Sequence, residues 1–180
     1  MANLMSHFLA YGVIAFTAFV PALPGQPAEL GQGWLAEFNH SAQQLTALAE
    51  ATPADKFGWR PGPGVRSISE VYMHIALGNY WLLGQAGVKP PGGGPKLEPD
   101  LERKTISKPE VIKWLKQSCD AVRESYPKAD LNQKVKFFGK DTTAGSVFLR
   151  ILVHNHEHMG QSIAYARMNG ITPPWSKKGD

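Results

Sequence analysis

Three histidines stand close together near the C-terminal end of the sequence, in the stretch LVHNHEHMGQ at residues 152–161. In a helix, which advances ~100° per residue, His154 and His158 lie ~40° apart and one turn from each other. His156 then points ~160° away from the midpoint of this pair. Two imidazoles at this spacing can chelate one divalent ion, and His156 is predicted not to join them.

A catalytic metal site generally has three protein ligands and one open position. The predicted third ligand is His74, in a segment at residues 67–84 that contains a single charged residue, Glu70. Gly78 follows one helical turn later and leaves room for another ligand. A lone histidine in such a segment is more often a hydrogen-bonded core residue, but inward-facing histidines from separate helices form metal sites in helical bundles. The predicted cofactor is one divalent ion, zinc or nickel, bound by three histidines.

Other catalytic arrangements find less support in the sequence. His156-Glu157 begins an H-E-x-x-H pattern, but Gly160 occupies the position of the second histidine. No G-x-S-x-G motif is present, although a triad of distant residues stays open. Glu70 is the nearest carboxylate that could act as a general base, and its place three residues after Ser67 favours a role in helix capping instead. The catalytic residues are therefore left unassigned.

Helical periodicity marks the segments that must position these histidines. The second and third segments each begin with Ser-x-x-Glu, which predicts a capping box, and Gly170 is the expected stop signal of the last. The sequence predicts an all-α fold, a four-helix bundle. Its helices are expected at residues 30–51, 67–84, 107–126 and 143–169.

Two connections between these helices differ in character. The stretch VKPPGGGPKLEPD at residues 88–100 is expected to hold no regular structure, within a long loop at residues 87–107 that is lid-like or simply mobile. The looser stretch KVKFFGKDTTAG at residues 134–145 includes a candidate short extended piece.

The first 28 residues contain no Asp, Glu, Lys or Arg. The apolar run at residues 8–20 has the length of a signal-peptide core and is shorter than the ~20 residues of a membrane span. We therefore expect a signal segment at residues 1–28, a bundle domain at 29–176 and a polar tail at 177–180. Export to the periplasm is favoured over a cytoplasmic location, and no stable membrane span is expected.

The remaining composition excludes several classes of protein. The net charge of +4 comes from scattered basic residues, which argues against a nucleic-acid groove. Cys119 is the single cysteine, so no intrachain disulfide is possible, and its place in an apolar stripe predicts a buried side chain. A small-molecule substrate is the expected partner, and a homodimer stays open.

Two motifs resemble the DinB/YfiT-like family of metal-binding four-helix bundles. They are WRPGPG leading into SISEVYMHIALGN, and HNHEHMGQSIAYARMNGITPP near the C-terminus. In that family a histidine of the second helix and an H-x-x-x-H pair of the fourth bind a divalent metal, which implies the same role for His74, His154 and His158. Relatives often have Arg where this chain has Met159, so no role of that Arg transfers.

The resemblance implies one of two kinds of reaction. Some relatives look like thiol S-transferases or isomerases and others like metal-dependent hydrolases, so a metalloenzyme of one of these types is the leading hypothesis. The alternative is a non-catalytic metal-binding envelope protein. A third reading has buried histidines and no metal.

Overall fold

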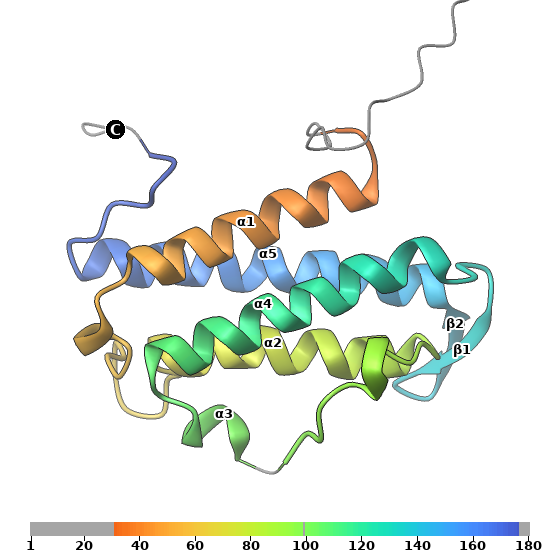
Figure 1. Ribbon diagram of the computed structural model, residues 1–180, viewed down its shortest axis with the longest axis horizontal. Coiled ribbons are helices and arrows are strands. Elements are labelled where there is room, and N and C mark those ends of the chain that lie inside the picture. Colours follow the sequence, from red (N-terminus) through yellow and green to blue (C-terminus); the bar gives the residue numbers. More distant parts are fainter. Residues whose placement is uncertain (1–30, 99, 177–180) are drawn as a thin grey trace, which may run out of the picture.

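A computed structural model describes residues 31–98 and 100–176. The expected signal segment and polar tail lie outside the described residues. Four long helices dominate the described part of the chain, and the prediction of a mostly helical bundle is confirmed (Figure 1). They are α1 (Trp34–Ala51), α2 (Ile68–Gln85), α4 (Lys108–Ser125) and α5 (Ala144–Met168). No helix among these residues is long and apolar enough to cross a membrane.

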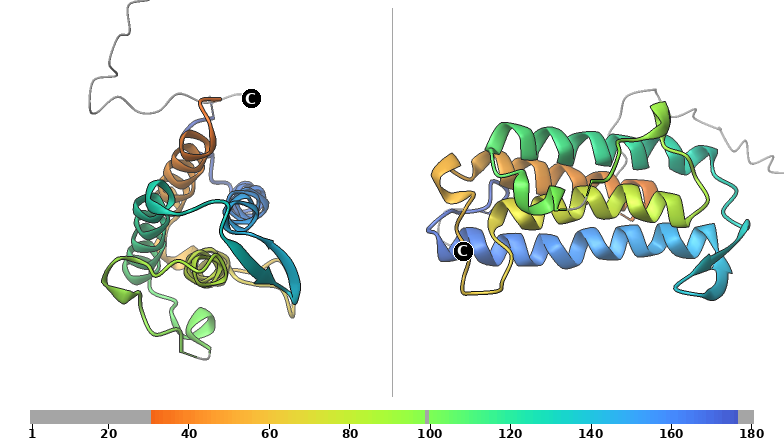
Figure 2. Two further views of the ribbon diagram at one scale, coloured as in Figure 1. Left: turned by 90° about the vertical axis from the view of Figure 1, so that its right-hand side faces the viewer. Right: turned by 90° about the horizontal axis from the view of Figure 1, so that it is seen from below.

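The four helices pack around a common core in which α1 and α2 lie diagonally opposite each other. Each of these two helices packs against both α4 and α5 (Figure 2). Hydrogen bonds at both ends of the bundle show that α4 runs antiparallel to α1. Lys108 Nζ donates to the carbonyl oxygen of Glu50, at 2.7 Å, and Arg123 Nε donates to Asn39 Oδ1, at 2.7 Å. Helix α2 also runs opposite to α1, so α2 and α4 run in the same direction (Figure 1).

The core forms because each helix buries an apolar stripe. Phe38, Leu115 and Ile151 are completely buried, as their helical spacing predicts, and the Cys119 thiol is buried with them. Burial raises the pKa of this thiol to about 12, so Cys119 serves as a small apolar residue. Trp34 closes one end of the core, where its ring stacks on that of Tyr126 with 4.2 Å between centroids. Large buried side chains on all four helices thus form the core of the bundle.

The two predicted capping boxes have different outcomes. At the start of α2, the Ser67 hydroxyl accepts a hydrogen bond from the Glu70 N–H at 3.3 Å, and Glu70 Oε2 accepts from the Ser67 N–H at 2.7 Å. The box predicted at Ser107 is wrong, because the Ser107 side chain makes no capping bond within the described structure. Pro109, at the second helical position, has no N–H and so removes one of the two donors that the Ser107 side chain could cap.

The connection from α2 to α4 runs back along the bundle, since the two helices share one direction (Figure 1). The expectation that residues 88–100 hold no regular structure is wrong, because they contain a 3₁₀ turn, Pro91–Gly93. A short helix, α3 (Leu101–Lys104), follows and packs on α2. The return path explains both the length of the connection and its contact with α2.

The predicted extended piece is an antiparallel hairpin between α4 and α5, at the end of the bundle away from α3 (Figure 1). Its strands are β1 (Lys134–Phe137) and β2 (Lys140–Thr143), and the register pairs Lys134 with Thr143. Phe138 and Gly139 have positive φ angles of 48° and 77°, as a two-residue hairpin turn requires. Thr143 then caps α5, where its hydroxyl accepts from the Ser146 N–H.

Candidate metal centre

Helices α2 and α5 bring three histidines together, as the sequence predicts. Each of His74, His154 and His158 offers one ring nitrogen, and the three nitrogens lie within 4.8 Å of one another. The Nε2 atoms of His74 and His154 are 3.2 Å apart. This is less than twice a zinc–nitrogen bond length of about 2.0–2.1 Å, so both atoms could bind one ion.

His156 stays outside the cluster. Its Nδ1 atom lies 2.9 Å from the carbonyl oxygen of Leu152, on the same helix, and the residue is not in the metal-competent group. The helix geometry used to exclude it is therefore confirmed.

Gly78 allows α5 to approach α2 at the site. A Cβ atom built on Gly78 would lie 2.5 Å from Cε1 of His154, which is closer than real Cβ contacts come. The room that the sequence predicts beside His74 is thus filled by the ring of His154. A residue without a side chain is required here for the histidines of the two helices to meet.

Hydrogen bonds fix the tautomers of two of the three rings. His74 Nδ1 lies 3.1 Å from Glu102 Oε2, and a carboxylate can only accept, so Nδ1 carries the proton. His158 Nδ1 lies 2.8 Å from Gln161 Oε1. An amide oxygen only accepts, so Nδ1 of His158 carries the proton, and the NH₂ group of Gln161 donates to the Tyr165 hydroxyl at 2.9 Å. Both rings therefore present an unprotonated Nε2, the form in which histidine binds metals.

The third ring, of His154, is the most buried of the three, at 9% exposure. Its Nδ1 atom has no hydrogen-bond partner among the described residues. Burial, reinforced by His158 and His74, lowers its pKa to about 4. Burial also lowers the pKa of His74, helped by Arg66 and opposed by Glu102. Both shifts favour the neutral imidazole, which is the form that binds metals.

Glu102 is the residue of the site that sequence reasoning missed. It lies on α3, where Arg66 Nε donates to its Oε1 at 2.6 Å while His74 occupies Oε2. Glu70, the nearest carboxylate that the sequence offers, has the capping role favoured for it: it is held by its capping box and by Arg60, at 3.1 Å. Burial raises the pKa of Glu70, and the hydrogen bonds from Ser67 and Arg60 outweigh that effect and lower it. An acidic residue followed by basic ones, as in LERK, is typical of a helical turn, yet it does not indicate the helix on which the turn packs.

A pocket of about 690 Å³ lies at the α3 end of the bundle, next to the residues that hydrogen-bond two of the histidines. Glu102 and Gln161, the hydrogen-bond partners of His74 and His158, form part of its wall. The His74 side chain is 29% exposed, so the cluster is open to solvent on one side.

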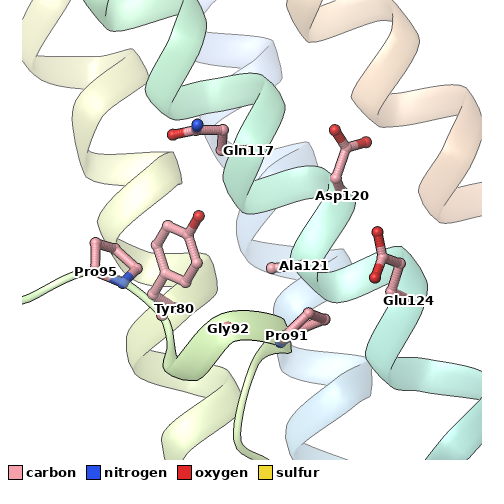
Figure 3. A pocket seen from close by; sticks show the side chains of 9 residues that line it. Tyr80, Pro91, Gly92, Pro95, Gln117, Asp120, Ala121 and Glu124 are labelled. Atoms are coloured by element: carbon pink, nitrogen blue, oxygen red, sulfur yellow. The ribbon is translucent and has the colours of Figure 1, made fainter.

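A second pocket, of about 350 Å³, lies between α2, α4 and the turn at residues 91–95 (Figure 3). Tyr80, Asp120 and Glu124 line it, and no histidine is among the described residues of its wall. Unlike the first pocket, it also includes neither Glu102 nor Gln161, so it is separate from the candidate metal centre.

A helical bundle with a three-histidine cluster on two facing helices is the class of protein that these observations define. The sequence profile of the DinB superfamily matches residues 37–162. This chain belongs to the DinB superfamily, and the resemblance drawn from its motifs is confirmed.

Solved structures agree with the fold. A DinB-like protein from Bacillus cereus superposes with a TM-score of 0.70 at 17% identity, covering 84% of this chain and 100% of the other. A DinB-like protein from Bacillus subtilis, YjoA, gives a TM-score of 0.58 at 17% identity, covering 77% of this chain and 92% of the other. A comparison with curated proteins gives no match. These likenesses establish the fold and leave the function to the site.

Proposed function

We propose that His74, His154 and His158 bind one divalent ion and that the protein is a metalloenzyme of the hydrolase or thiol S-transferase type. The observation that carries the proposal is the tautomer pattern. Two rings hold their protons on Nδ1 against Glu102 and Gln161, and direct unprotonated Nε2 atoms into the space shared with His154. Imidazole ligands suit zinc and nickel, the ions expected from the sequence.

A bound divalent ion would supply Lewis acidity, which polarises a carbonyl group or favours the deprotonated form of water or a thiol. The protein's part is to hold the three rings in place. Glu102 accepts the Nδ1 proton of His74, and Arg66 in turn fixes Glu102. Gln161 does the same for His158 and is itself held by Tyr165. Such outer partners orient metal ligands and raise their basicity.

A non-catalytic metal-binding protein is the second candidate. The hydrogen bonds that Glu102 already makes favour it. Both oxygens of this carboxylate already have partners, Arg66 and His74. The nearest carboxylate to the cluster is therefore not free to take a proton from a substrate or a water molecule. A general base would have to come from the substrate or from rearrangement of Glu102.

Metal analysis of protein made without a polyhistidine tag tests the shared part of both candidates. We expect close to one equivalent of zinc or nickel, which chelation removes. His154→Ala should lose most of this metal and His156→Ala should retain it. The two variants are a matched pair because both remove a histidine from the same helix. Equal loss in the two variants would refute the assignment. Turnover on panels of esters, amides and thiol adducts then separates the enzyme from the non-catalytic protein.

The charge-free leader supports a further part of the proposal, that the protein is exported and loses its first 22 to 28 residues. Mass spectrometry of the natively produced protein should find a mature chain that begins within or just after this range. A chain that begins at Met1 or Ala2 would count against cleavage.

A further inference from the structure

The pocket beside the histidines is built from segments that are far apart in the sequence. Residues 60–66 form one wall, α3 another, and Gln161 of α5 a third. The stretch RPGPGVR, which the sequence analysis links to the family, is therefore the wall of a pocket as well as a connection. The volume of this pocket, about 690 Å³, lies in the range of small-molecule sites, about 300–1,000 Å³.

The wall of this pocket is polar and carries more positive than negative charge. Arg60, Arg66 and Arg103 line it together with Glu70 and Glu102, which leaves one positive charge in excess. A pocket that binds an uncharged apolar ligand is lined mainly by apolar and aromatic side chains. Here Val65 and Gly64 are the apolar contributors among the described residues.

The three arginines differ in how far the protein already occupies them. Arg60 donates to the Val65 carbonyl oxygen at 2.8 Å and to Glu70, so it closes the turn. Arg66 uses Nε for Glu102 and leaves its two terminal amino groups without partners among the described residues. The Arg103 side chain makes no hydrogen bond or ion pair with the described part of the chain. Arg66 and Arg103 therefore offer guanidinium donors to a ligand.

We propose that this pocket binds the carboxylate or phosphate group of a small anionic substrate and holds that substrate beside the histidines. Guanidinium groups match the oxygens of carboxylates and phosphates with parallel hydrogen bonds. Glu102 and Gln161 line the pocket and also hydrogen-bond His74 and His158, so these two side chains stand between an anion in the pocket and the histidine rings. The inference rests on the metal centre proposed above and specifies the substrate class of that site.

Calorimetric titration of the metal-loaded full-length protein tests this inference, with succinate and inorganic phosphate as probes. We expect at least one of them to bind, and Arg103→Gln to weaken it about tenfold, the lower end for a charge-assisted hydrogen bond because Arg103 is exposed. Lys104→Gln is the matched control, since it removes the same charge from the next residue of α3 but lies outside the pocket wall. It should change the affinity less than twofold. Succinamide, the neutral counterpart of succinate, should bind much more weakly. The probe that binds more tightly distinguishes a carboxylate from a phosphate site.

Three results would overturn the inference. They are no binding of either probe at millimolar concentration, equal affinity in the wild type and Arg103→Gln, or equal affinity for succinate and succinamide. Anion binding directly to the metal would give the second result, because Arg103 would then be irrelevant. Metal content measured in the same samples separates this failure from failure of the metal centre. If the wild type holds no metal, the metal proposal fails, while the effect of Arg103→Gln still decides whether the anion pocket exists.

Discussion

Replacement of Gly78 by alanine should weaken metal binding without unfolding the bundle. The new Cβ atom would lie 2.5 Å from His154 Cε1, whereas ordinary contact begins at 3.4 Å. The ring of His154 must therefore withdraw by about 0.9 Å, or α2 and α5 must separate by a similar amount. Either movement changes the 3.2 Å separation between the Nε2 atoms of His154 and His74. A site needs its ligands placed to within about 0.5 Å, so we expect metal affinity to fall on the order of tenfold to a hundredfold.

The effect on stability should be small because two terms oppose each other. Overpacking costs about 1–3 kcal/mol, and alanine is favoured over glycine inside a helix by about 1 kcal/mol. The matched control is Gly84→Ala, also in α2, where an added Cβ meets nothing within 4 Å among the described residues. It should stabilise the helix slightly and leave metal affinity unchanged.

Competition titration with a chromophoric chelator measures both affinities, and circular dichroism melts measure both stabilities. Metal affinity in Gly78→Ala equal to that of the wild type would refute the argument that the close approach of His154 builds the site. An equal loss of affinity in Gly84→Ala would refute it too.

Three further predictions concern Glu102, the metal-free protein and pH. Glu102→Gln should lower metal affinity about tenfold, because an amide stabilises the Nδ1 proton of His74 less than a carboxylate does. Glu98 is an exposed carboxylate paired with Lys96, so Glu98→Gln should leave the affinity unchanged when both variants are titrated with metal. Chelation should leave the protein helical and lower its melting temperature by roughly 8–16 °C, because metal at a thousandfold excess over Kd adds roughly 4 kcal/mol and ~1 kcal/mol moves a domain of this size by ~2–4 °C. Loss of helix at room temperature in circular dichroism would make the metal structural. The free energy of unfolding of the chelated protein should also fall by on the order of 3 kcal/mol as the pH drops from 6.5 towards 4. The reason is that His154 takes up a proton in the unfolded state, whereas in the folded state its pKa of about 4 keeps it neutral. Urea titrations at each pH measure this dependence, which His154→Gln should flatten.

The sequence predicts the helices well because each has a strong local signal. Apolar periodicity places α1, α2, α4 and α5 close to their observed bounds, and the Ser67–Glu70 capping box forms as expected. The histidine pair of α5 follows from spacing within one helix. His74 follows from its place in a nearly uncharged helix, which must be buried on several sides. These are properties of single segments, which a sequence displays directly.

Glu102 and the pocket could not be predicted because they depend on how segments meet. Residues 87–107 are rich in Pro and Gly and lack periodicity, which indicates a loop. This pattern does not indicate which helix the loop packs against. Glu70 attracts attention because it lies one turn before His74 on the same helix, but its side chain turns back to cap that helix. The capping motif thus indicates the role of Glu70 correctly, and nothing in the sequence indicates that Glu102 takes the place beside His74.

The direction of the helices explains why the segment that connects α2 to α4 supplies part of the site. Because α2 and α4 run the same way, the chain must return along the bundle between them, and its last part, α3, passes beside the first half of α2 (Figure 1). That half contains His74, so the return path is what places Glu102 against its Nδ1 atom. An up-down-up-down bundle with short turns would place no chain there and would leave His74 without this partner. The same segment presents Arg103 to the pocket. The three histidines therefore come from the long helices, and both the hydrogen-bond partner of His74 and one arginine of the proposed anion pocket come from the crossing segment.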